Sequence, residues 1–137
     1  MSEELRMREG RSLAQALEEH LVDWSERTGI AVETWALPTH DAPPRIARAV
    51  LATLGEALSN VERHSGAALV SVAVTLGPGG LRMTVSDHGE GFDGPATGRG
   101  VTAMRDHLRG VGGTLTVNGV PGEGTTVTAV VPRRRRG

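Results

Sequence analysis

The run from Arg45 to Ser65 constrains the fold most, because its apolar residues recur at helical spacing. At about 100° per residue, the apolar positions fall within an arc of about 140°, which is the stripe of a core-facing helix. These positions are Ile46, Val50, Leu51, Leu54, Ala57, Leu58 and Val61. We therefore expect a long helix over residues 45–65 that packs on the core.

Three polar residues flank this stripe at intervals of four: Glu56, Asn60 and His64. Each step of four advances the position by only about 40°, so the three lie in one row at the edge of the buried face. One interpretation is a solvated polar flank. Asn60 favours a second, since asparagine is a poor interior helix former. Its carbonyl oxygen beside a carboxylate is a hard ligand that suits Mg²⁺ while the ion keeps waters and phosphate oxygens.

A second polar box follows a predicted hairpin. Residues 67–76 and 81–87 are apolar, strand-like runs, and the Gly-Pro-Gly-Gly sequence between them is typical of a tight turn. The second strand ends in Asp87, and Gly89 and Gly91 follow at once. This order places a carboxylate at a strand end, next to backbone that can turn freely.

The remaining elements follow from caps, breakers and alternation. We expect a helix over residues 12–28, with Ser12 as N-cap and Gly29 as stop, and a loop over residues 38–44. The other predicted elements are a strand over residues 30–37, a Gly-rich stretch over 88–98, a helix over 100–109, and strands over 114–118 and 125–131 around a Pro-Gly-Glu-Gly turn.

Length and composition predict one domain. The chain has 137 residues, which suffices for a real core. We expect a flexible segment at 1–11, a domain over 12–132 and a basic tail at 133–137. A net charge of -1 gives no case for nucleic acid. Without cysteine there are no disulfides or thiolate sites. No apolar run predicts membrane contact and no signal peptide opens the chain, so we expect the segment to be cytoplasmic.

Four boxes in order carry a family resemblance. They are Glu-x-x-x-Asn60-x-x-x-His64, Asp87-x-Gly89-x-Gly91, Gly98-x-Gly100-Val101 and Gly124-Thr125-x-Val127. They resemble the N, G1 and G2 boxes and the final strand of sensor histidine kinases, over about residues 12–132. The short gap from Phe92 to Gly98 resembles the nitrate/nitrite-sensor type, which has a short ATP lid. The resemblance implies a two-layer α/β sandwich of the Bergerat type, with one mixed sheet and helices on one face.

The resemblance also implies a role for each box residue with ATP and Mg²⁺. Asn60 would ligate the metal, and Asp87 would accept the adenine amino group in a charge-assisted bond worth about 1.5 to 3 kcal/mol. The other implied roles are His64 facing the phosphates, Glu56 in the metal and phosphate environment, Gly89 and Gly91 under the base, Gly98 and Gly100 as hinges and amide donors beside Arg99 and Val101, and Thr125 near Asp87, directly or through water.

Three residues depart from the family pattern without removing a required group. His88 follows the G1 aspartate, Arg99 separates the G2 glycines, and Ala103 lies in the following helix. Arg99 allows two interpretations. It either adds a cation near the phosphates or points to solvent.

The implied function is the catalytic domain of a sensor histidine kinase. Its γ-phosphoryl group would pass to a histidine on a separate helical hairpin, with a response regulator downstream. Of the histidines in the chain, only His40, in His40-Asp41, imitates an acceptor. Pro43 and Pro44 follow it and disfavour a helix, so we expect no acceptor here.

Other functional classes are weaker or stay open. An anti-sigma-factor type serine kinase shares the same boxes and is the main alternative. A non-catalytic interaction module with a degenerate pocket is a third possibility. A dinucleotide fold would need Gly-x-Gly-x-x-Gly between an early strand and its helix, whereas Gly98-Arg99-Gly100 comes late and lacks the third glycine; the histidines show no zinc spacing.

Overall fold

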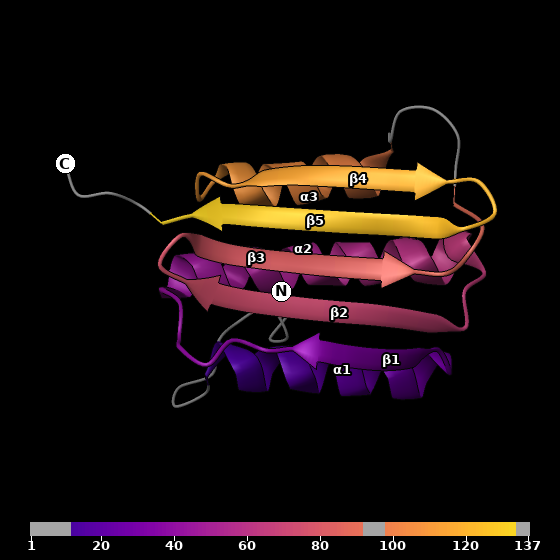
Figure 1. Ribbon diagram of the computed structural model, residues 1–137, viewed down its shortest axis with the longest axis horizontal. Coiled ribbons are helices and arrows are strands. Elements are labelled where there is room, and N and C mark those ends of the chain that lie inside the picture. Colours follow the sequence, from indigo (N-terminus) through magenta and orange to yellow (C-terminus); the bar gives the residue numbers. More distant parts are fainter. Residues whose placement is uncertain (1–11, 92–97, 134–137) are drawn as a thin grey trace.

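Five strands form one mixed sheet in the computed structural model, which describes residues 12–91 and 98–133 (Figure 1). The order across the sheet is β1-β2-β3-β5-β4. Strand β1 (Ala31–Ala36) is parallel to β2 (Leu69–Gly77), and all other neighbours are antiparallel. The remaining strands are β3 (Gly80–Asp87), β4 (Thr114–Val120) and β5 (Gly124–Pro132).

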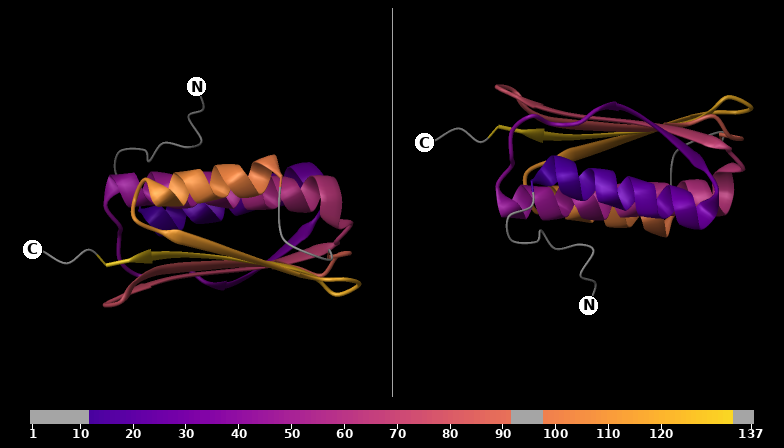
Figure 2. Two further views of the ribbon diagram at one scale, coloured as in Figure 1. Left: turned by 90° about the horizontal axis from the view of Figure 1, so that it is seen from above. Right: turned by 90° about the horizontal axis from the view of Figure 1, so that it is seen from below.

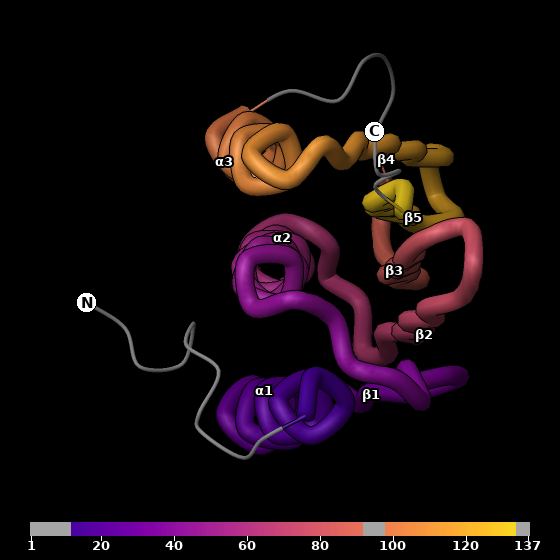
Figure 3. The backbone as a smooth tube through the Cα atoms, turned by 90° about the vertical axis from the view of Figure 1, so that its left-hand side faces the viewer, coloured from indigo at the N-terminus to yellow at the C-terminus, as the bar shows by residue number. Residues whose placement is uncertain are grey.

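Three α-helices cover one face of this sheet (Figures 2 and 3). They are α1 (Leu13–Thr28), α2 (Pro44–Asn60) and α3 (Arg99–Arg109). In Figure 3 the helices form one layer and the strands another, with α2 between α1 and α3. The predicted two-layer α/β sandwich, with one mixed sheet and helices on one face, is confirmed.

The core lies between the two layers. Every second residue of β2 and β3 points into it, as the buried positions Val70, Val72, Leu81 and Met83 show. The predicted stripe of α2 faces the same core. All of its members are buried except Ile46, which packs against the cluster from its edge.

The ends of α1 match the sequence prediction. The Ser12 hydroxyl accepts from the Gln15 amide at 3.1 Å, and the Gln15 side chain accepts from the Ser12 amide at 3.0 Å, which makes a capping box. The helix ends at Gly29, whose φ of 78° is left-handed.

The predicted long helix over residues 45–65 differs in its last turn. Its α-helical part begins at Pro44 and ends at Asn60, and Val61–Ser65 form a π-helical turn, η2. Gly66, with φ 70°, then ends the helix. Apolar periodicity shows which face is buried. It does not reveal a local change from i→i+4 to i→i+5 bonding.

The hairpin between β2 and β3 closes as predicted, with Gly77 opposite Gly80. Strand β2 begins two residues later than predicted and β4 ends two residues later, at Val120. Residues 1–11 and 134–137, and with them the predicted flexible segment and most of the basic tail, lie outside the described residues. None of the helices within the described ranges combines the length and the hydrophobicity that a bilayer span requires.

Candidate functional site

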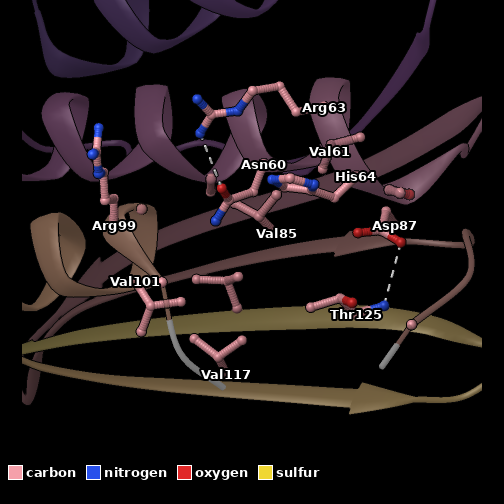
Figure 4. Close-up of a pocket in the computed structure, with 16 residues that line it drawn as sticks. Asn60, Val61, Arg63, His64, Val85, Asp87, Arg99, Val101, Val117 and Thr125 are labelled. Atoms are coloured by element: carbon pink, nitrogen blue, oxygen red, sulfur yellow. Dashed lines mark hydrogen bonds between the residues drawn. The ribbon is translucent and has the colours of Figure 1, made fainter. Parts of the chain in front are cut away.

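A cavity of about 710 Å³ opens at the end of the molecule where α2 passes into η2 and α3 begins (Figure 4). This volume is in the range of small-molecule sites. Its wall comes from α2, η2, the start of α3 and the strands β3, β4 and β5. The lining residues are Ala57, Asn60, Val61, Arg63, His64, Ser65, Val85, Asp87, Gly91, Gly98, Arg99, Gly100, Val101, Val117, Thr125 and Val127.

The floor of the cavity is apolar. Val85, Val117 and Val127 come from three neighbouring strands, and Val101 comes from the first turn of α3. Figure 4 shows Val101 and Val117 apart from the polar side chains, and Val85 beside Asn60 and His64. Such a floor suits the apolar face of a flat ring, while polar groups at the edge of the ring would contact the polar residues of the site.

Asp87 is the buried polar group of the site, with 7% of its surface exposed. Its Oδ1 accepts from two backbone amides, Gly89 at 2.9 Å and Thr125 at 3.3 Å. Within residues 12–91 and 98–133, no group donates to its Oδ2. Oδ2 can therefore accept a hydrogen bond from a donor group of a molecule bound in the cavity.

Asn60 lies across the cavity, at the end of α2, with its side chain against α3. A Cβ atom at Gly100 would stand 2.6 Å from Asn60 Oδ1, so any larger residue there would displace the Asn60 amide. The Arg63 guanidinium donates to the same oxygen at 3.4 Å, as the dashed line in Figure 4 shows. Asn60 therefore holds a hard amide oxygen at the cavity wall.

The donor set around Asn60 fits Mg²⁺ that is bound mainly by a phosphate ligand and water. The described residues contain no cluster of three His, Cys, Asp or Glu that would form a complete protein metal site. Mg²⁺ commonly takes one or two protein oxygens and completes its shell with substrate phosphates and water. Asn60 Oδ1 supplies such an oxygen.

Two arginines and a histidine lie at the same wall. Arg63, His64 and Arg99 are exposed and line the cavity. In Figure 4 the guanidinium groups of Arg63 and Arg99 lie toward α2, away from the valine floor. The cavity thus has an acceptor in its buried part and positive charge at its mouth, a distribution that suits a ligand with a polar ring and an anionic end.

The loop after Asp87 is held by backbone contacts that need glycine. A Cβ atom at Gly89 would collide with Ser65, and one at Gly91, where φ is 68°, would collide with the carbonyl of Val120. The Glu90 amide donates to Ser65 O at 2.9 Å, and its carbonyl accepts from Gly122 at 2.7 Å. The loop is therefore anchored to η2 on one side and to the β4–β5 turn on the other.

Most of the predicted site residues come together around the cavity. Asn60, His64, Asp87, Gly91, Gly98, Arg99, Gly100, Val101 and Thr125 all line it. Gly89 does not line the cavity, but its backbone amide donates to Asp87. Glu56 is half-buried on α2 and is not among the described residues that line the space. Thr125 meets Asp87 directly through its backbone amide.

Sequence reasoning missed Arg63, Val85 and Val117. Val85 could have been found, because it precedes Asp87 by two residues and so shares its side of the strand. Arg63 adjoins His64 in the first box. No local signal places Val117 of β4 beside the box residues, since its position depends on sheet order. The predicted short lid between Phe92 and Gly98 lies largely outside the described residues.

Comparison with known sequences gives consistent matches. Residues 46–135 match the family described as histidine kinase-, DNA gyrase B- and HSP90-like ATPases. The chain is 37% identical over 128 residues to the sensor histidine kinase MctS of Rhizobium johnstonii, and 32% identical over 127 residues to the sensor histidine kinase LiaS of Bacillus subtilis. These matches cover 88% and 90% of this chain but only 28% and 35% of the relatives, so the chain spans a minor part of their length.

Solved structures show the same architecture. The histidine kinase domain of a blue-light activated histidine kinase from Erythrobacter litoralis is 25% identical, with a TM-score of 0.77 over 88% of this chain and 61% of that one. The ATP binding domain of PrrB from Mycobacterium tuberculosis is 18% identical, with a TM-score of 0.72 over 91% of this chain and 96% of that one. The second likeness bears on the fold alone.

Proposed function

This chain belongs to the family of histidine kinase-, DNA gyrase B- and HSP90-like ATPases, and we propose that residues 12–132 form the ATP-binding catalytic domain of a sensor histidine kinase. Its substrate would be ATP with Mg²⁺, and its product a phosphohistidine on another domain. The segment would act in the cytoplasm, where ATP is available.

The observation that carries this proposal is the free oxygen of Asp87. Because Oδ1 is engaged by Gly89 and Thr125, the carboxylate is fixed with Oδ2 available to the cavity. The exocyclic amine of adenine would donate to Oδ2, and the ring would rest on the valine floor. Guanine carries a carbonyl at that position of its ring and would face the carboxylate with an acceptor, so the site would select adenine.

The phosphates would extend toward the cationic wall. Arg63, His64 and Arg99 line that side, and the amides that open α3 follow Gly98, whose φ of 115° begins the helix. Asn60 would hold Mg²⁺, which when bound would offset the phosphate charge. Glu56 stands one turn before Asn60, and we assign it no closer role than the surroundings of the metal and phosphates.

The phosphoacceptor would lie on a separate helical hairpin domain, with a response regulator as the next recipient. His40 is exposed in the loop between β1 and α2 rather than on a helix, which argues against it as the acceptor. Phosphoryl transfer requires donor and acceptor to be held in line, and this chain would hold the donor.

Replacing Asp87 tests the nucleotide assignment. Asp87→Ala should weaken ATP binding by about 10- to 100-fold, because one charge-assisted bond is lost, and should affect GTP far less. Asp87→Asn should shift the preference toward GTP, since its amide would donate to the guanine carbonyl. Titration calorimetry with both nucleotides measures this, with Asp106→Ala on the exposed end of α3 as control. Equal losses for ATP and GTP would contradict the adenine assignment.

Transfer of label tests the kinase assignment. With labelled ATP, the chain alone should gain no acid-labile phosphate, whereas a histidine-bearing helical hairpin added in trans should gain it slowly and in a concentration-dependent way. Label on the isolated chain that disappears in His40→Ala would make His40 the acceptor. Acid-stable label on a serine of a sigma-factor regulator would instead favour the anti-sigma-factor type of kinase.

A further inference from the structure

A carboxylate outside the cavity joins the cavity wall to helix α1. Among residues 60–65, all of which the structure describes, only Glu62 does not line the cavity. Its Oε1 accepts from the indole Nε1 of Trp24 at 3.3 Å, and its Oε2 accepts from Arg27 at 3.2 Å. Trp24 is 4% exposed, so this donor belongs to the core, whereas Arg27 and Glu62 form an exposed ion pair.

The π-helical turn is the part of the site whose placement most needs outside support. It supplies Val61, Arg63, His64 and Ser65 to the cavity and directly follows Asn60. π-Helical turns are rare, and they occur mostly as single turns within α-helices, frequently at functional sites. Glu62 ties this turn to α1 through its bonds to Trp24 and Arg27.

Helix α1 receives a carboxylate at each end. At its start, Asp41 Oδ1 accepts from the Leu13 amide at 2.7 Å, and at its end Glu62 accepts from Trp24. The two carboxylates belong to different parts of the molecule. Asp41 belongs to the loop between β1 and α2, none of whose residues lines the cavity, whereas Glu62 belongs to the cavity wall. Only the second contact links α1 to the site.

We propose that Glu62 is a positioning residue, which fixes η2 against Trp24 so that the placement of α1 sets the affinity for nucleotide. The proposal rests on the proposed ATP site. A shift of α1 that breaks the hydrogen bond between Trp24 and Glu62 would allow η2 to move. Asn60, Arg63 and His64 would then move with it. By linkage, nucleotide binding would in turn strengthen the contact between Glu62 and Trp24.

Variants that remove the contact at one end of α1 and keep the contact at the other end test this proposal. Trp24→Phe keeps an aromatic ring but removes the N–H donor together with part of the indole, and Glu62→Ala removes the acceptor. Each should raise the Kd for Mg-ATP about three- to tenfold, as expected for one lost hydrogen bond. Glu62→Gln keeps an acceptor for Trp24 and should change the Kd less than about twofold. Asp41→Ala, the matched control, should lower the melting temperature and leave the Kd within about twofold.

The wild-type chain offers a second readout, because it has two tryptophans in contrasting places. Trp24 contacts Glu62, whereas Trp35 on β1 is 73% exposed and bonds to Glu33 of its own strand. In nitrogen-15 spectra, saturating Mg-ATP should shift the indole N–H signal of Trp24 and leave that of Trp35 in place.

The outcomes separate this inference from the proposed function. If the wild type binds Mg-ATP but the Trp24 signal does not move, or if Trp24→Phe and Glu62→Ala bind as the wild type does, the positioning role is wrong while the ATP site stands. If Asp41→Ala weakens binding as much as Glu62→Ala, general loosening of α1 explains the effect and the inference fails. If the wild type does not bind Mg-ATP, the proposed function falls and this inference with it.

Discussion

The two ends of the layer between helices and sheet differ in how completely side chains fill them. At the end away from the cavity the layer is packed with long side chains, among them Leu81 and Met83 of β3 and Met104 and Leu108 of α3. At the cavity end the same two elements carry Val85 and Val101. In β4, Leu115 is likewise followed by Val117.

The space between the two layers is thus filled by side chains at one end and contains the cavity at the other. Strand β3, strand β4 and helix α3 each carry a smaller apolar side chain toward the site, namely Val85, Val117 and Val101. A fully buried leucine or methionine fills the gap between layers, whereas valine leaves space that the chain does not refill. The cavity is therefore a result of side-chain size along α3, β3 and β4, and apolar character alone does not distinguish its floor from the core.

The largest expected effect concerns the filled end. Leu108→Ala should lower the free energy of unfolding by about 2 to 5 kcal/mol, because a fully buried side chain leaves a cavity. Val101→Ala, on the same helix at the hollow end, should cost about 1.5 kcal/mol or less, since its neighbourhood is already open. Urea denaturation of both variants measures the difference. Equal losses would contradict the contrast between the two ends.

An intermediate effect concerns filling the hollow end. Val85→Met puts a methionine at the cavity end of β3, the same residue type as Met83 two positions earlier. The longer side chain should occupy the floor and weaken Mg-ATP binding about tenfold or more, with the melting temperature unchanged or raised. Calorimetry and thermal unfolding together test this. Wild-type affinity in a well-folded variant would show that the valine floor is not where the base rests.

The smallest effect concerns the surface of the filled end. The ion pair between Arg109 and Asp106 at 3.2 Å is exposed on both sides. Arg109→Ala should change the free energy of unfolding by less than about 0.5 kcal/mol and leave nucleotide binding unchanged. A loss comparable to that of Leu108→Ala would mean that apolar filling is not what stabilises this end.

The sequence predicted the framework of the site better than its floor. Asn60 and Asp87 stand out because polar groups at the edge of apolar runs break a pattern, and glycines mark close approaches such as Gly100 against Asn60. Strand alternation places Val85 on the same side as Asp87, but it does not place Val117 beside them and does not show that the space above either valine is empty.

Glu56 and the π-helical turn show the limit of helical periodicity. The row Glu56, Asn60 and His64 assumes α-helical steps throughout, but the turn after Asn60 is closed by wider i→i+5 bonds. His64 nevertheless lines the cavity with Asn60, whereas Glu56, on the regular α-helical part, does not. The direct bond from the Thr125 amide to Asp87 likewise depends on the pairing of β3 with β5, which no local pattern encodes.

The parallel pairing of β1 with β2 has a consequence for the order of assembly. Strands β2 and β3, and likewise β4 and β5, are joined by tight turns, so they can pair through contacts close in sequence. Strand β1 reaches β2 only across the whole of α2, and closing so long a loop is slow. We therefore expect the hairpins that carry Asp87 and Thr125 to form early, and the α1–β1 unit to dock late.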